Sequence, residues 1–106
     1  MTNALPDPVV LHVYDCDPQT DESAENMPLV LLHGFPFDHT VWNAQISDFG
    51  GDHNVLAFDL RGHGASPVTD DAVYSMELLA ADVLHALDRL KIPRAIWVGQ
   101  SMGGYV

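Results

Sequence analysis

The segment that decides the fold is Ala-Ile-Trp-Val-Gly-Gln-Ser-Met-Gly-Gly, residues 95–104. Its first four residues form an apolar run typical of a β-strand, and the next five, Gly99 to Gly103, fit the pattern Gly-x-Ser-x-Gly. In a sharp turn from a strand into a helix, the central Ser takes a strained backbone conformation that exposes its hydroxyl. The residues two before and two after it crowd together and must be Gly. The segment therefore predicts a strand–turn–helix unit with Ser101 at its tip.

A helix that begins near Met102 has a chemical consequence for the hydroxyl of Ser101. Its first backbone N–H groups and the positive end of its dipole point at the same place. An oxyanion formed beside Ser101 would be stabilised there. The pattern is short, however, and a tight turn with an incidental Ser remains an alternative at this point.

Two further apolar runs lie upstream, at residues 28–32 and 54–58. Neither alternates with polar residues, which is typical of parallel strands covered by helices on both faces. The run at 95–98 predicts a third buried strand of the same kind. A first strand is predicted at residues 9–14, which are β-branched and aromatic-rich, and the polar stretch from 15 to 26 predicts an exposed turn.

The clearest helix is predicted from about Met76 to Leu90, with Ser75 as its N-cap and Glu77 in its first turn. Its apolar stripe consists of Met76, Leu79, Ala80, Val83, Leu87 and Leu90, and the positions predicted to lie away from the stripe are Asp82, His85 and Arg89.

A shorter helix is predicted after Thr40, which can cap it, and Gly50-Gly51 ends it. Its apolar residues Trp42, Ile46 and Phe49 recur at helical spacing. Strands that alternate with helices predict an α/β fold with a mostly parallel sheet and flanking helices.

His33-Gly34-Phe35 follows the buried run at 28–32. A tetrahedral intermediate needs two hydrogen-bond donors, usually backbone N–H groups. Met102 can supply one, and the loop after this strand is placed to supply the other from Phe35. For the His33 side chain we favour bracing of the loop over a role as general base.

Three blocks of the chain, in order, resemble the α/β-hydrolase fold family, and the resemblance covers nearly the whole length. The likeness is greatest to its small esterase, lactonase and haloperoxidase-like members. The blocks are residues 31–36 (Leu-Leu-His-Gly-Phe-Pro), residues 59–66 (Asp-Leu-Arg-Gly-His-Gly-Ala-Ser) and residues 99–104 (Gly-Gln-Ser-Met-Gly-Gly).

The resemblance implies that Ser101 is the nucleophile and that the backbone N–H groups of Phe35 and Met102 form the oxyanion hole. It implies supporting roles for His33, Gly34, Gly99, Gln100 and Gly103. Residues 59–66 form a structural loop in the family, so we favour bracing over catalysis for Asp59, Arg61 and His63.

One departure from the family pattern concerns the catalytic triad. In the family the acid and the His follow the Ser along the chain, whereas all six histidines here precede Ser101. We therefore expect residues 1–106 to be the N-terminal part of one α/β-hydrolase domain, ending just after the nucleophile turn. The acid, the base and the cap region would be absent, the chain as given would be inactive, and residues 95–98 would form an open apolar edge.

The expected function is hydrolysis of a small carboxylic ester or lactone through an acyl-enzyme on Ser101. Ser101 argues against the dehalogenase and epoxide-hydrolase branches, which use Asp as the nucleophile. Alternatives are a same-fold C–C hydrolase, acyltransferase, lyase or perhydrolase, and a catalytically inactive fragment or binding module.

The charge composition of the chain restricts the classes of partner that it can bind. The chain has 106 residues with 15 acidic and 4 basic side chains, a net charge of −11, and no Lys or Arg among its first 60 residues. Such a chain repels phosphate backbones and anionic membranes, so we expect neither partner. High-salt adaptation is an alternative interpretation of the acidity.

A single Cys16 and the absence of a leader-like segment favour the cytoplasm. No ligand spacing supports a metal at His39 with Asp38, or at His12 with Asp15 or Asp17. We therefore expect no metal or organic cofactor, and the oligomeric state is left open.

Overall fold

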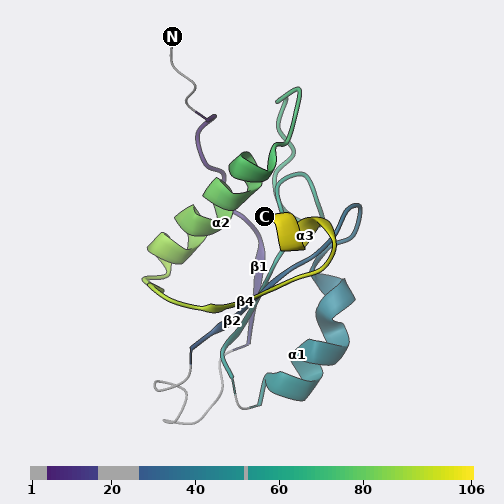
Figure 1. Ribbon diagram of the computed structural model, residues 1–106, viewed down its shortest axis with the longest axis vertical. Helices are drawn as coiled ribbons and strands as arrows, with labels where there is room; N and C mark the ends of the chain where they lie inside the picture. Colours follow the sequence, from purple (N-terminus) through teal and green to yellow (C-terminus); the bar gives the residue numbers. More distant parts are fainter. Residues whose placement is uncertain (1–4, 17–26, 52) are drawn as a thin grey trace.

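The computed structural model describes residues 5–16, 27–51 and 53–106. Within these residues a four-stranded sheet lies between helices (Figure 1), with the strands in the order β1-β3-β2-β4. Central β2 runs parallel to both of its neighbours, and β1 is antiparallel to β3. The strands are β1 (Val13–Cys16), β2 (Leu29–Leu32), β3 (Val55–Phe58) and β4 (Ile96–Gly99). The predicted α/β class and mostly parallel sheet are confirmed.

The two central strands are buried on both faces, as their unbroken apolar sequences predict. On one face, side chains of β2 and β3 pack against helix α2 (Met76–Arg89). On the other face they pack with Ile46 of helix α1 (Asn43–Phe49). Alternate residues of a strand point to opposite faces, so a strand covered on both sides needs apolar residues at every position. Figure 1 shows α1 and α2 on opposite sides of the strands.

Helix α2 begins and ends close to the predicted limits. The Ser75 hydroxyl accepts the Leu78 N–H at 3.1 Å, and the helix ends at Arg89 with Leu90 as the C-cap. The predicted position of Asp82 away from the apolar stripe is wrong, because Asp82 is fully buried. Leu90, predicted in the stripe, is 43% exposed.

Asp82 is buried because Arg61 neutralises it. Arg61 donates from Nε and Nη2 to the two carboxylate oxygens of Asp82, both at 2.8 Å, and from Nη1 to Asp71 at 2.9 Å. Its Nη2 also donates to the Asp7 carbonyl, at 3.0 Å. The hydrogen bonds that Arg61 donates to Asp82 raise the pKa of Arg61 above its usual value. A paired Arg–carboxylate fork of this kind satisfies charges that would otherwise be too costly to bury.

The first strand is shifted from its predicted position at residues 9–14. It pairs with β3 over Val13–Cys16, with Val13 opposite Phe58 and Cys16 opposite Val55. The backbone before it makes other bonds: the Val9 N–H donates to Asp82 at 3.2 Å, and the His12 N–H donates to Ser66 Oγ at 2.8 Å. Of the predicted turn at 15–26, the first two residues belong to β1, and 17–26 lie outside the described residues.

The predicted capping by Thr40 is also wrong. Asp38 is the N-cap of a short 3-10 helix, η2 (His39–Trp42), and its carboxylate accepts both the N–H and the hydroxyl of Thr40. Asp is an effective cap because its carboxylate reaches the first free N–H groups. Helix α1 follows η2 directly and ends at Phe49, with Gly50 as its C-cap, as predicted.

Strand β4 is an exposed edge rather than a buried strand. In the described part of the chain it pairs only with β2, and Ile96, Trp97 and Val98 are 43%, 49% and 37% exposed. The open apolar edge implied by the family resemblance is therefore present.

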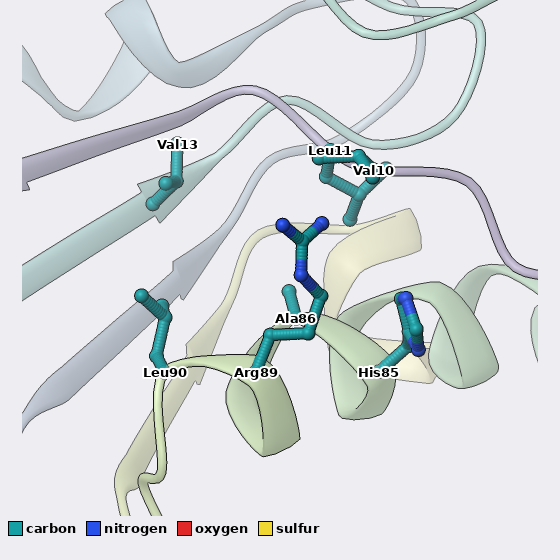
Figure 2. Close-up of a pocket in the computed structure, with 7 residues that line it drawn as sticks. All are labelled: Val10, Leu11, Val13, His85, Ala86, Arg89 and Leu90. Carbon is teal, nitrogen blue, oxygen red and sulfur yellow. The ribbon is translucent and has the colours of Figure 1, made fainter.

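A groove lies between helix α2 and the segment that leads into β1 (Figure 2). It is lined mainly by apolar side chains, and Arg89 extends from α2 toward Val10 and Leu11. Neither Ser101 nor the loop after β2 contributes to it. Within the described ranges, no helix has the length and apolar character needed to cross a membrane.

The Arg61–Asp82 pair makes a stability prediction. We expect Asp82→Ala to lower the free energy of unfolding by about 3–5 kcal/mol, because it leaves the buried guanidinium without its main partner. Urea denaturation followed by circular dichroism measures this. Replacing both residues by apolar ones, Arg61→Met with Asp82→Leu, is expected to cost less than the single change. An Asp82→Ala protein as stable as the original would contradict the structural importance of the pair.

Candidate active site

Ser101 stands at the turn between β4 and helix α3 (Met102–Tyr105). Its backbone has φ 52° and ψ −113°, in the left-handed half of conformational space, where a side chain is strained. Ser101 is exposed at this turn. A strained Ser on a strand-to-helix turn is the geometry that the Gly-x-Ser-x-Gly pattern predicts.

The two glycines of the pattern are required by close backbone contacts. A Cβ on Gly99 would lie 2.5 Å from backbone atoms of Gly103 and Gly104. A Cβ on Gly103 would overlap the carbonyl groups of Leu32 and His33, where β2 ends. The turn therefore lies directly against the end of the central strand, and any side chain at either position would push it away.

The loop after β2 lies against the same turn. A Cβ on Gly34 would be 3.1 Å from the Gln100 carbonyl oxygen and 3.3 Å from the Cβ of Ser101. The Gly34 N–H donates to Oε1 of Gln100 at 3.4 Å, and the Gln100 N–H donates to the Leu32 carbonyl at 2.9 Å. The structure thus brings the segment 33–35 together with Ser101, although 66 positions separate Gly34 from Gln100 in the chain.

Two backbone donors near this contact have no hydrogen-bond partner among the residues that the structure describes. Among the described residues, no hydrogen bond uses the N–H of Phe35 or the N–H of Met102. They belong to the residues directly after Gly34 and directly after Ser101, two residues in close proximity. Free N–H donors of this kind can donate hydrogen bonds to an anionic oxygen formed beside Ser101.

His33 is buried and held at both ring nitrogens. Its Nε2 accepts the Leu60 N–H at 2.9 Å, so the proton is on Nδ1, which donates to the Gly34 carbonyl at 2.8 Å. Burial lowers the pKa of His33, although the hydrogen bond to Gly34 opposes this effect. With both nitrogens occupied, the ring links the loop after β2 to the loop after β3.

The segment 59–66 forms a compact loop built around Asp59. The Asp59 carboxylate accepts the Ala65 N–H at 3.0 Å, and a Cβ on Gly64, which has φ 52°, would overlap that carboxylate. Burial raises the pKa of Asp59, but hydrogen bonds from Ala65 and His39 outweigh it and hold the pKa below its usual value.

His63, from the same loop, lies beside the residues near the turn. Its ring centroid is 5.0 Å from that of His33 and 5.7 Å from that of Phe35. Its Nδ1 donates to the Arg61 carbonyl at 2.9 Å. These contacts are bracing contacts, and in the described part of the chain no hydrogen bond connects Ser101 to a histidine ring.

Sequence reasoning missed two polar residues that shape this region. Asp82 was assigned to the solvent side of its helix, and His39 was considered only with its neighbour Asp38. In the structure, His39 instead pairs with Asp59. Both partners are remote in sequence, so local spacing carried no signal for either pair.

Comparison with known proteins is in line with this geometry. The sequence matches the alpha/beta hydrolase fold family over residues 27–106, and the chain belongs to that family. It is 35% identical over 80 residues to Epoxide hydrolase 4 of Mus musculus, an alignment that covers 74% of this chain and 22% of that protein. It is 37% identical over 81 residues to 3-oxoadipate enol-lactonase 2 of Acinetobacter baylyi, covering 76% of this chain and 30% of that protein.

A solved structure extends the likeness over almost the entire chain. A thermophilic esterase from Thermogutta terrifontis superimposes with a TM-score of 0.84 at 35% identity, over 99% of this chain and 36% of the esterase. The chain thus spans roughly a quarter to a third of the length of its relatives. These relatives include hydrolases of esters, lactones and epoxides.

The glycine contacts can be tested with a matched pair of substitutions. We expect Gly103→Ala to destabilise the protein by about 1–3 kcal/mol, because its Cβ has to displace the backbone at the end of β2. Gly104→Ala is the control: its Cβ would lie 3.8 Å from the Gly99 carbonyl oxygen, an ordinary van der Waals distance. Thermal denaturation compares the two, and equal melting temperatures for both variants would refute the close contact.

The buried neutral His33 predicts acid sensitivity. Its pKa in the folded protein lies below the ordinary value of 6.5, so the unfolded chain binds its proton first as the pH falls. The stabilisation is complete above about pH 6.5 and is lost as the pH drops from there through the lowered pKa. We expect His33→Asn to flatten this decline in melting temperature, whereas His85→Asn on α2 leaves it unchanged. If the melting temperatures of the two variants fall equally with decreasing pH, the acid sensitivity does not come from His33.

Proposed function

We propose that this chain carries the nucleophile and the oxyanion hole of a serine hydrolase that cleaves small carboxylic esters or lactones. The observation that supports this most directly is the exposed Ser101 on a left-handed turn, packed against a loop with a free backbone donor. The enol-lactonase and esterase names of the relatives favour the same substrate class.

The reaction would proceed in two steps. The Ser101 Oγ attacks the substrate carbonyl carbon while a base takes its proton, and the negative charge moves to the carbonyl oxygen. The N–H groups of Phe35 and Met102 donate to that oxygen. The intermediate then collapses, the alcohol leaves with the proton, and Ser101 holds the acyl group as an ester. Water, activated by the same base, releases the carboxylic acid and restores the Ser101 hydroxyl.

Ester and lactone substrates fit Ser101 better than epoxides do. Attack of a Ser hydroxyl on an epoxide carbon would give an ether, which water does not cleave under mild conditions. Attack on a carbonyl gives an ester, which water does cleave. The likeness to Epoxide hydrolase 4 is therefore assigned to the shared fold, and the chemistry to the residue at the turn.

We further propose that the general base and the acid that orients it come from chain segments other than these 106 residues. No histidine of the described part is hydrogen-bonded to Ser101, and His33 has no free ring nitrogen. By itself, the 106-residue chain is expected to hydrolyse esters slowly, because a Ser without a base is a weak nucleophile.

The test is substitution of Ser101 in a protein that includes the base. We expect Ser101→Ala to lower kcat for p-nitrophenyl acetate and for a small lactone by at least about a thousandfold, because the acyl-enzyme cannot form. A fluorophosphonate probe, followed by mass spectrometry of the labelled peptide, is expected to modify Ser101.

Ser47 offers a matched control, since it is an exposed Ser on α1 outside the proposed site. We expect Ser47→Ala to retain both turnover and labelling. Normal turnover by the Ser101→Ala protein would refute the proposal. Loss of turnover without any labelling of Ser101 in the parent protein would favour a non-covalent role and contradict the acyl-enzyme.

A further inference from the structure

A second polar cluster lies at the end of β3 where β1 begins, and it contains His12, His39 and Asp59. The antiparallel register pairs Val13 with Phe58, and the Asp59 N–H donates to the His12 carbonyl at 2.9 Å. His12 and Asp59 therefore continue the ladder as opposed neighbours, whose side chains lie on the same face. The sheet itself holds these two side chains together.

His39 is added to this pair by two hydrogen bonds to one carboxylate oxygen. Its backbone N–H and its ring Nδ1 donate to Oδ1 of Asp59 at 2.7 and 2.8 Å. The ring of Tyr14 stacks on His39, with centroids 6.0 Å apart and planes inclined by 12°. Nδ1 of His39 and Oδ1 of Asp59 therefore face each other, and an ion could take the place of the proton between them once that proton moves to Nε2.

The cluster retains unused ligand atoms. Over the described residues, no hydrogen bond uses either ring nitrogen of His12 or Nε2 of His39. The Asp59 carboxylate accepts three hydrogen bonds, two from His39 and one from Ala65, of about four that its lone pairs allow. His12 and Asp59 can therefore still donate an electron pair, and His39 can do so from Nδ1 once its proton moves to the unused Nε2.

The dimensions and exposure of the cluster suit a bound ion. One ligand atom from each residue lies within 4.8 Å of the others, and the two imidazole centroids are 5.5 Å apart. Ligand atoms around one tetrahedral zinc ion are separated by about 3.4 Å, so the longest separation has to shorten by up to about 1.4 Å. His12 is exposed and free to rotate, whereas the Asp59 side chain is only 1% exposed and is held in place.

We propose that His12, His39 and Asp59 form a binding site for a divalent transition-metal ion of the zinc type. Two imidazoles and a carboxylate favour Zn²⁺, Co²⁺ or Ni²⁺ over Mg²⁺, which prefers oxygen ligands and retains its water. The ion would join the start of β1, the start of η2 and the end of β3. Its role would be to stabilise this corner of the fold, independently of the chemistry proposed for Ser101.

The experiment is a calorimetric titration of the full chain with Zn²⁺ in the presence of excess Mg²⁺. The excess Mg²⁺ screens the negative field of a chain with net charge −11, so that Zn²⁺ attracted only by that field does not contribute to the titration. We expect one Zn²⁺ per chain, and a rise in melting temperature with Zn²⁺ because the ion binds the folded state. Substitution of Co²⁺ is expected to give a visible absorption band from nitrogen and oxygen ligands.

The ligand assignment is tested by His12→Ala, which changes an exposed side chain and is expected to fold normally. We expect it to weaken Zn²⁺ binding at least about tenfold and to remove the thermal shift. His85→Ala, on α2, is the matched control and is expected to bind as the parent does. Absence of saturable Zn²⁺ binding above the Mg²⁺ background would overturn the proposal, as would unchanged affinity in the His12→Ala protein.

Discussion

The candidate site depends on the contact between the turn at Ser101 and the end of the central strand β2. Backbone atoms of Gly103 lie so close to the carbonyl groups of Leu32 and His33 that no side chain fits between them. This contact fixes the height of Ser101 above the sheet and its distance from the loop after β2. The loop after β2 and the turn at Ser101 meet because both leave the sheet at this one edge, where parallel strands end together.

A second constraint, the buried Arg61, holds the periphery of the site. Arg61 connects helix α2 through Asp82, the following loop through Asp71 and the N-terminal segment through the Asp7 carbonyl. Because Arg61 belongs to the loop after β3, these bonds also fix the backbone that leads to His63. His33 then couples that loop to the loop after β2 by accepting the Leu60 N–H. The rigid frame around Ser101 is thus built largely from charged and polar residues.

Much of this frame could be predicted from local sequence, because its causes are local. The unbroken apolar runs of β2 and β3 predicted strands covered on both faces, Ser75 predicted the start of α2, and the spacing of Gly99 and Gly103 predicted a sharp turn. The remaining features depend on distant partners. Asp82 is buried because of Arg61, 21 positions away, and His39 contacts Asp59, 20 positions away.

The displacement of the first strand has the same origin, since its register is set by β3 and by bonds to Asp82 and Ser66. Within the site, the turn and its neighbouring loop followed from glycine patterns and from the family resemblance. The pairing of His39 with Asp59 did not, because a pattern of adjacent residues cannot show which loops meet in space.

The exposed edge of β4 bears on the colloidal behaviour of the protein. Its outer backbone groups have no strand partner among the described residues, and its side chains are apolar, so two copies could join edge to edge. Each copy, however, carries a net charge of −11, and their mutual repulsion acts over about 8 Å at physiological ionic strength. Added salt shortens that range and weakens this barrier to association. In the 106-residue chain, the acidic surface is therefore expected to oppose self-association at this sheet edge, a task that many β-proteins give to lysine or proline on the edge strand itself.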